Sequence, residues 1–524
     1  MPTLLVRPGL LSFAQLRGSL AQGTQLAIEA SAAAGIAASA QLVQQAADGD
    51  APVYGVNTGF GKLASQRIGH EDLGRLQINL LRSHAVGVGE PLSPAVVRLV
   101  LLLKATSLAR GYSGVRAEVI DALLALYNQG ITPVIPCQGS VGASGDLAPL
   151  AHLALALIGE GEVTYLGERT QAAVALAHAH IKPLQLRAKE GLALINGTQV
   201  STALALDALL AADRLFEAAV ISGALTLDAA RGSDGPFDPR IHAVRGQPGQ
   251  IDCAAAYRSL MADSEIRRSH LQNDDRVQDP YSLRCQPQVM GACLDQIRYA
   301  AQVLVREANA VTDNPLVFAQ QGSLLSGGNF HAEPVALAAD ALAVAIAEIG
   351  AITERRIAML VDTVVSRLPP FLTPEPGLNS GFMIVHVTAA ALASENKSLA
   401  HPASVDSLPT SANQEDHVSM ATFAARRLAQ ILKNTAHIVA IELLAAAQGI
   451  EFLRPLKSSP ALESVLRLVR SVSPAMMQDR SLARDIEAVH HLVAAGDIGH
   501  AIEERIPELH ALRLDEPSPC VRKR

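Results

Sequence analysis

The stretch TQVSTALALDALLAADRLFEAAVISGALTLDAA, residues 198–230, decides the fold class. It is rich in Ala and Leu, which favour helices, and it contains no Pro. Its polar positions are few and form no wide polar face, so we expect a long helix that is buried on most sides. Residues 331–362 and 379–399 have the same character. The sequence therefore predicts a bundle of long, nearly core-like helices.

The composition agrees with an all-α fold. The chain has 524 residues, 49% of them hydrophobic, but only 3% are aromatic and 18% are charged, against about 25% charged in an ordinary soluble domain. At about 150 residues per domain the length alone would suggest three or four domains. The excess of apolar helix faces instead favours one helical subunit whose faces are buried by further copies, which predicts a homo-oligomer.

Charge and cysteine usage limit the partners. The 43 basic and 50 acidic residues give a net charge of −7, which argues against binding to nucleic acid or to an anionic membrane. The apolar stretch 335–352 contains Asp340 and Glu348, so we expect no bilayer span. The five cysteines form no CxxC pair and the N-terminus lacks a secretory signal pattern, which together predict a cytoplasmic protein.

Irregular segments separate the predicted helices and divide the chain. Residues 232–239, 326–329 and 368–377 are rich in Gly, Pro and small polar residues. Helical signals dominate only after residue 197. We therefore predict a loop-rich helical part over 1–196 and a central helical bundle with C-terminal helices over 197–524.

The loop QGSVGASGD, residues 138–146, has two interpretations. Three glycines before a helix, predicted to begin near Pro149 with Asp146 as its cap, are typical of a tight turn or an anion nest. Alternatively, the Gly145 nitrogen can attack the Ala143 carbonyl, and Ser144 can lose its hydroxyl. Loss of two waters would give a methylidene-imidazolone (MIO), an electrophile made from the chain itself. A helix N-terminus nearby would stabilise negative charge on its ring carbonyl.

Several motifs in order resemble the MIO-dependent aromatic amino acid ammonia-lyases, from about residue 5 to about residue 500. Besides GSVGASGDLAPLAH they are YGVNTGFG at Tyr54, LINGTQ around Asn196, VQDPYSLRCQPQVMGA from Val277, DNPLVF from Asp313, SGGNFHAEP from Ser326 and LPTSANQEDHVSM from Leu408. The resemblance implies a MIO group formed from Ala143, Ser144 and Gly145, with no external cofactor. It also implies a homotetramer whose sites are assembled from three subunits.

The resemblance assigns roles to three residues after Val277. Tyr281 and Arg284 are three apart and can share one face of a turn; on spacing alone they would be a packed tyrosine and an exposed arginine. By resemblance Tyr281 is the base that removes the β-proton, and Arg284 clamps the substrate carboxylate. Gln278 would support the same polar cluster.

Three further residues have an ordinary alternative. Tyr54 would be a turn aromatic, Asn196 a helix cap and Phe330 a core residue. By resemblance Tyr54 belongs to a mobile loop that closes over the substrate near the departing ammonia. Asn196 would contact the MIO ring or the substrate, and Phe330 would pack beside the electrophile.

Substrate choice depends on His84 and Glu415. Branches of the family that act on phenylalanine or tyrosine usually carry Phe-Leu or His-Leu where this chain has Ser83-His84, and Gln where it has Glu415. An imidazole and a carboxylate would hydrogen-bond a substrate imidazole and would serve no purpose beside a phenyl ring. The resemblance therefore implies elimination of ammonia from L-histidine to give trans-urocanate, the first step of histidine degradation.

Other interpretations stay open at this point. Within the family, the chain could be a phenylalanine or tyrosine ammonia-lyase or an aminomutase. A fumarase-like lyase is also a helical oligomer, but its GSSxMPxKxNP loop is absent. A helical interaction protein with an inert Gly-rich loop is the non-enzyme alternative. The pairs His178 with His180 and His490 with His491 lack the spacing of a helical zinc pair, so we predict no metal.

Overall fold

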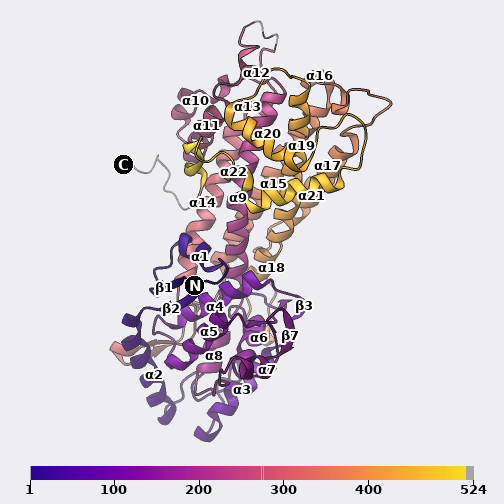
Figure 1. Ribbon diagram of the computed structural model, residues 1–524. Coiled ribbons are helices and arrows are strands. Elements are labelled where there is room, and N and C mark those ends of the chain that lie inside the picture. The colour runs from indigo at the N-terminus through magenta and orange to yellow at the C-terminus, as the bar shows by residue number, and fades with distance from the viewer. Residues whose placement is uncertain (1, 273, 275, 515–524) are drawn as a thin grey trace. The chain divides into compact units, whose positions relative to one another are not determined.

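The computed structural model describes residues 2–272, 274 and 276–514 (Figure 1). The chain divides into two compact units. Unit 1 comprises Met1–Asp207, Ala301–Asp340 and Pro402–Arg426, and unit 2 comprises Ala208–Ala300, Ala341–His401 and Arg427–Arg524. Each unit is thus built from three chain segments. The division at residues 196 and 197 that the sequence suggests stays a prediction.

Unit 1 combines helices of moderate length with short strands. Its helices are α1 (Phe13–Ser19), α2 (Ala33–Asp48), α3 (Leu73–His84), α4 (Pro94–Leu108), α5 (Ala117–Gln129), α6 (Leu147–Leu157), α7 (Ala172–His178), α8 (Glu190–Ile195) and α18 (Ala421–Arg426). Ser93 caps α4 by accepting from the Val96 backbone N–H, with Pro94 in the first turn. Val96 to Leu108 is buried except for Arg98, so α4 forms the core of this unit.

All nine strands of the described residues lie in unit 1 and form four small sheets. They are β1 (Thr3–Val6), β2 (Gln25–Ile28), β3 (Val88–Pro91), β4 (Thr132–Pro133), β5 (Pro136–Gln138), β6 (Glu162–Tyr165), β7 (Glu168–Gln171), β8 (Leu316–Phe318) and β9 (Ser323–Leu325). β1 and β2 pair in parallel, with Thr3 opposite Gln25, and the other pairs are antiparallel: β3 with β5, β4 with β6, β6 with β7 and β8 with β9. The fold is mainly helical, and the prediction of an all-α fold missed the short strands, which form where extended loop segments, in the N-terminal part and at residues 316–325, pair with one another.

Unit 2 is helical. Its helices are α10 (Pro239–Arg245), α11 (Pro248–Met261), α12 (Glu265–Arg268), α13 (Tyr281–Arg284), α16 (Thr363–Ser366), α17 (Met383–Leu399), α19 (Leu428–Glu451), α20 (Pro460–Val472), α21 (Ala483–Ala495) and α22 (Asp497–His500). Three longer helices contribute residues to both units: α9 (Gln199–Ala229), α14 (Gln286–Ala308) and α15 (Glu333–Val361). Ile357, Ala389, Ala393, Ile438 and Ile441 form an apolar cluster that joins α15, α17 and α19.

The long helices confirm the prediction from periodicity. The stretches predicted at 198–230, 331–362 and 379–399 are α9, α15 and α17, whose bounds differ by at most four residues. Two helical stretches, Glu333–Val361 and Ala421–Glu451, are long and apolar enough to cross a membrane, but 67% and 78% of their apolar windows are buried inside the protein. Burial of this extent is typical of core helices.

Asp146 holds the N-cap position of α6, as predicted, but its side chain does not cap this helix. α6 begins at Leu147, and the Asp146 side chain makes no capping hydrogen bond to it. Asp146 Oδ2 instead accepts from the backbone N–H groups of Val200 and Ser201, at 3.0 and 2.8 Å, in the first turn of α9. The carboxylate therefore caps α9, the helix whose first turn it contacts, and leaves the first turn of α6 without a side-chain acceptor.

Candidate active site

The backbone of residues 142–146 requires glycine at two positions. Gly142 and Gly145 have φ values of +68° and +72°, which residues with a side chain rarely adopt. A Cβ at Gly145 would lie 2.2 Å from the carbonyl oxygen of Gly197. The Asp146 N–H donates to that same oxygen at 2.8 Å. The loop is therefore pressed against the Asn196–Gly197 turn, and no residue larger than glycine fits at position 145.

Ser144 is held at two atoms. The Asn196 Nδ2 donates to the Ser144 carbonyl oxygen at 3.0 Å, and the Ser144 hydroxyl donates to Glu415 Oε1 at 2.7 Å. Asn196 follows the last residue of α8, and Glu415 lies in the loop before α18. The Asn196 amide thus donates to the oxygen that would become the ring carbonyl oxygen of a MIO group. The Glu415 carboxylate accepts from the hydroxyl group that dehydration would remove.

Glu415 is kept ionised by the hydroxyl groups around it. Thr410 and Ser411 donate to its Oε2 at 2.7 and 3.0 Å. Partial burial would raise the pKa of Glu415, but the hydrogen bonds from Ser144, Thr410 and Ser411 and the nearby His84 outweigh this effect and hold the pKa below its ordinary value. A carboxylate that stays charged at neutral pH therefore faces Ser144.

His84 ends α3 and has one nitrogen fixed. Its Nδ1 lies 2.9 Å from the Leu80 carbonyl oxygen and 3.0 Å from the Ser83 hydroxyl. A proton on Nδ1 satisfies the carbonyl and leaves Nε2 with a lone pair. Burial lowers the pKa of His84, although the Leu80 carbonyl and Glu415 act in the opposite direction. At neutral pH His84 is therefore an uncharged acceptor.

A cavity of about 1180 Å³ in unit 1 brings most of the predicted site residues together. Its lining includes seven of them: Tyr54, His84, Ala143, Ser144, Asn196, Phe330 and Glu415. The Tyr54 hydroxyl accepts from the Gly61 N–H at 3.3 Å, within the motif YGVNTGFG. Gly145 lies in the same loop as Ser144. The cavity is large enough for an amino acid substrate.

Gln278, Tyr281 and Arg284 belong to unit 2. Tyr281 and Arg284 are the first and last residues of α13 and share one face, as their spacing predicts. The Tyr281 side chain is 71% exposed, and the Arg284 guanidinium carbon lies 4.7 Å from the centre of its ring. Gln278 is also exposed. Their roles toward a substrate stay predictions.

Some residues of the site escaped sequence reasoning. Thr410 and Ser411 hold Glu415, and Lys104 donates to the Asn196 carbonyl oxygen at 2.8 Å. Thr410 and Ser411 stand in the motif LPTSANQEDHVSM, and their position in this motif, next to Glu415, could have indicated that they belong to the site. Lys104 had a weaker signal, as a lysine that directly follows the apolar run at residues 99–103 of α4.

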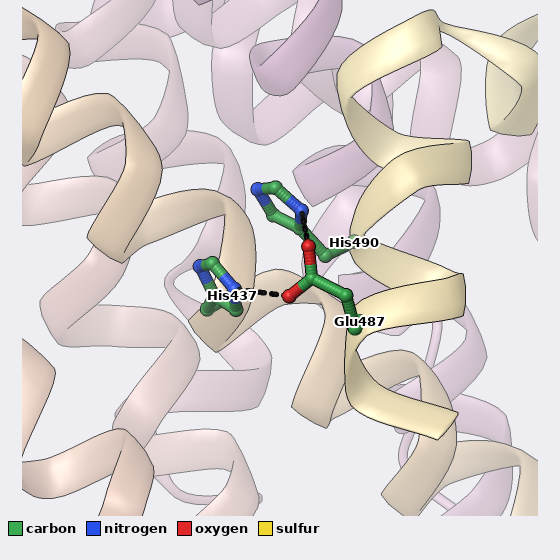
Figure 2. A group of neighbouring side chains, drawn as sticks. All are labelled: His437, Glu487 and His490. Atoms are coloured by element: carbon green, nitrogen blue, oxygen red, sulfur yellow. Dashed lines mark hydrogen bonds and ion pairs between the residues drawn. The ribbon is translucent and has the colours of Figure 1, made fainter. Parts of the chain in front are cut away.

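One group of side chains in the described part of the chain could hold a metal ion: His437, Glu487 and His490. Figure 2 shows the Glu487 carboxylate of α21 between His437 of α19 and His490. The two rings are stacked, with centroids 3.9 Å apart and an angle of 12° between planes. A metal ion lies near the plane of each imidazole that binds it, and nearly parallel stacked planes do not share one. The three side chains are therefore better described as a histidine–carboxylate cluster than as a metal site. The absence of a metal stays a prediction.

Comparisons with known proteins identify the family of this chain. The family described as "Aromatic amino acid lyase" matches residues 11–471. Histidine ammonia-lyase from Rhodospirillum rubrum is 61% identical over 494 residues, 94% of this chain and 96% of that one.

Among solved structures, histidine ammonia-lyase from Trypanosoma cruzi has a TM-score of 0.90 and 41% identity, with 99% of both chains covered. Tyrosine aminomutase from Streptomyces globisporus has a TM-score of 0.91 and 36% identity, covering 96% of this chain and 99% of that one. The chain belongs to the aromatic amino acid lyase family.

Proposed function

We propose that the protein is a histidine ammonia-lyase that eliminates ammonia from L-histidine to give trans-urocanate. The observation that carries this proposal is Ser144, which lies in the wall of the cavity between the Asn196 amide and the Glu415 carboxylate. High identity to a histidine ammonia-lyase over nearly the whole chain supports the same reaction. The reaction class is a carbon–nitrogen lyase.

We propose that Ala143, Ser144 and Gly145 form the MIO group. The tight backbone supports this, because only glycine fits at position 145 and an unhindered nitrogen is what the cyclisation needs. The group would supply an electrophilic methylene to the substrate. Asn196 would bind the ring carbonyl oxygen, and loss of the Ser144 hydroxyl would leave Glu415 Oε1 without its donor. Maturation would thus free a charged acceptor inside the cavity.

The histidine side chain fits the polar groups of the cavity. His84 Nε2 carries a lone pair, which can accept from the N–H of a substrate imidazole. Glu415 is charged and lines the same cavity. Phenylalanine has no hydrogen-bond donor on its ring and would leave the His84 acceptor without a partner, at a cost of about 1–3 kcal/mol. Tyrosine could donate its phenol O–H to His84, so the polar groups favour histidine over phenylalanine, and the high identity to histidine ammonia-lyase favours histidine over tyrosine.

The remaining roles are those that the family resemblance implies. Tyr281 removes the β-proton, Arg284 binds the substrate carboxylate with support from Gln278, Tyr54 closes over the substrate and Phe330 packs beside the MIO group. The Arg284 guanidinium lies close to the Tyr281 ring, and a positive charge near a phenol favours its ionised form.

Two measurements test the proposal. Each of L-histidine, L-phenylalanine and L-tyrosine is supplied to the enzyme, and ultraviolet absorbance is followed for a conjugated acrylate. We expect turnover of histidine that exceeds the other two by at least about 100-fold. Turnover of tyrosine without histidine, or a β-amino acid product, would instead indicate a tyrosine ammonia-lyase or an aminomutase.

Mass spectrometry of the peptide that contains Ser144 tests the electrophile. We expect the mass of the unmodified peptide less two waters, and S144A should retain the full mass of its own sequence and lose activity. An unmodified wild-type peptide would leave the enzyme without its electrophile.

We also propose that the protein is a cytoplasmic homotetramer. Apolar side chains on α17 support a self-association surface, since Ile384 and Val387 are 65% and 53% exposed. Leu337 and Val344 on α15 are also about half exposed. Light scattering coupled to size exclusion should give four times the chain mass, and a monomeric mass at micromolar concentration would contradict this.

A further inference from the structure

Lys104 is a fully buried lysine on α4 whose hydrogen bonds go to uncharged acceptors. Its Nζ donates to the carbonyl oxygens of Asn196 at 2.8 Å and Ala193 at 3.2 Å, where α8 ends. Burying an ammonium group costs free energy, which the carbonyl dipoles of a helix end and the fields of Asp146 and Asp313 offset in part. A methionine of similar length would avoid this cost, so the position has another requirement.

The Asn196 carbonyl belongs to the peptide that joins Asn196 to Gly197, and the two residues on either side of this peptide hold the loop that contains Ser144. The Asn196 side chain donates to the Ser144 carbonyl oxygen, and the Gly197 carbonyl accepts from the Asp146 N–H. The chain leaves the helical conformation here, with ψ of 129° at Asn196 and φ of +128° at Gly197. A non-helical turn of this kind is held mainly by the hydrogen bonds to its own carbonyl groups.

We propose that Lys104 is a positioning residue for the elimination reaction. It fixes the Asn196–Gly197 peptide, and through that peptide it holds the Asn196 amide against the Ser144 carbonyl oxygen. The inference rests on the proposed function, in which this oxygen is the ring carbonyl oxygen where negative charge gathers. A donor held in place before the reaction stabilises such charge without reorganisation, and a misplacement of about 1 Å can cost about 100-fold in rate.

A double-mutant cycle tests the inference. The variants are K104M, N196A and the double variant K104M/N196A, with T106V as the matched control because Thr106 is also buried on α4 and donates only to the Leu102 carbonyl. For each protein, kcat and KM for L-histidine are measured, and the fraction of the Ser144 peptide that has lost two waters is used to normalise kcat.

We expect K104M to lower the normalised kcat about 10- to 100-fold and to change KM by less than about two-fold. In the N196A background the same change should cost less than about two-fold, because the group through which Lys104 acts is gone. T106V should keep the wild-type kcat.

Three results would overturn the inference: an unchanged normalised kcat in K104M, an equal loss with and without Asn196, or an equal loss in T106V. If K104M does not fold, the same cycle is carried out with K104Q, which keeps a hydrogen-bond donor. A loss of normalised kcat in K104Q that disappears in the N196A background supports the positioning role of Lys104. A loss that is the same in both backgrounds refutes it. A wild-type Ser144 peptide of unmodified mass would refute the proposed function and is a separate result.

Discussion

Ser144 is held by side chains that are 52 and 271 residues away in the chain. At the residue scale, this placement gives one serine both a hydrogen-bond donor and a charged acceptor. Glu415 in turn depends on two hydroxyl groups of its own loop. Each of these contacts can be removed by a change of a few atoms, which makes their contributions measurable.

Replacing the Glu415 carboxylate by an amide tests the charged acceptor. In E415Q the amide keeps the shape of the side chain and removes its charge. We expect kcat/KM for histidine, and kcat with it, to fall about 10- to 100-fold, the loss that goes with a hydrogen bond between the substrate and a charged group. Steady-state kinetics check this, and the mass of the Ser144 peptide separates a loss of catalysis from a loss of maturation. Wild-type kcat in E415Q would contradict the role.

Removing the His84 imidazole tests substrate choice. H84L deletes the acceptor for the substrate N–H and leaves an apolar group of similar size. We expect kcat/KM for L-histidine to fall about 10- to 100-fold, the loss that goes with one unpaired buried hydrogen bond. Turnover of L-phenylalanine, measured on the same preparation, should stay equal or rise. An equal loss for both substrates would instead indicate a structural role for His84.

At the element scale, the N-terminus of α9 is stabilised by a carboxylate from a loop far away in sequence. Asp146 Oδ2 accepts from two backbone N–H groups of the first turn and from the Ser201 hydroxyl, while Oδ1 accepts from Thr422 and Ser140. Asp146 is fully buried. One side chain therefore ties the Ala143–Gly145 loop to α9 and to α18.

Alanine at position 146 should affect stability and the loop together. D146A leaves two N–H groups of α9 without acceptors, which costs about 1–2 kcal/mol for a helix cap. We expect a lower midpoint of thermal unfolding and a smaller fraction of the Ser144 peptide with two waters lost. Circular dichroism and mass spectrometry measure the two effects. A lower midpoint with full maturation would show that the cap and the loop are independent.

At the scale of the whole molecule, unit 2 contains a fully buried ion pair between two of its long helices. In unit 2, Glu442 of α19 accepts from Ser222 and Thr226 of α9, at 2.6 and 2.8 Å, and pairs with Arg356 of α15. Arg356 and Glu442 are fully buried. The pair fixes three long helices relative to one another within this unit.

Breaking this pair should cost more than removing it. E442L leaves the Arg356 guanidinium buried without its partner, at about 3–5 kcal/mol, and R356M leaves the carboxylate in the same position. The double variant R356M/E442L removes both charges, so we expect its thermal midpoint to lie above those of both single variants. Thermal unfolding of the four proteins checks this. A double variant less stable than either single variant would be inconsistent with the buried pair as described.

The stability of the protein should depend on pH through Lys104. Burial lowers the pKa of Lys104 from 10.5 to about 7. Between these values the unfolded chain binds a proton that the folded chain does not, so the free energy of unfolding rises as the pH is raised from about 7 towards 10.5. In K104M the free energy of unfolding should no longer show this part of its increase with pH. Denaturant unfolding at pH 7 and pH 9 measures it, and an unchanged slope would contradict the shifted pKa.

The helical character, the three long helices and the loop at 138–146 could all be predicted from the amino-acid sequence, because helix periodicity and a contiguous tripeptide are local properties. It also indicated seven residues that line one cavity: six stand in the quoted motifs, and His84 stands at a position where branches of the family differ. The side-chain contacts between distant segments are visible only in the folded protein. Asp146 caps α9 and not α6, Glu415 bonds Ser144, and Lys104 supports Asn196. Each of these hydrogen bonds joins residues that are far apart in the sequence. Which of them meet depends on how the chain folds back on itself, and neither motif spacing nor helix propensity specifies this.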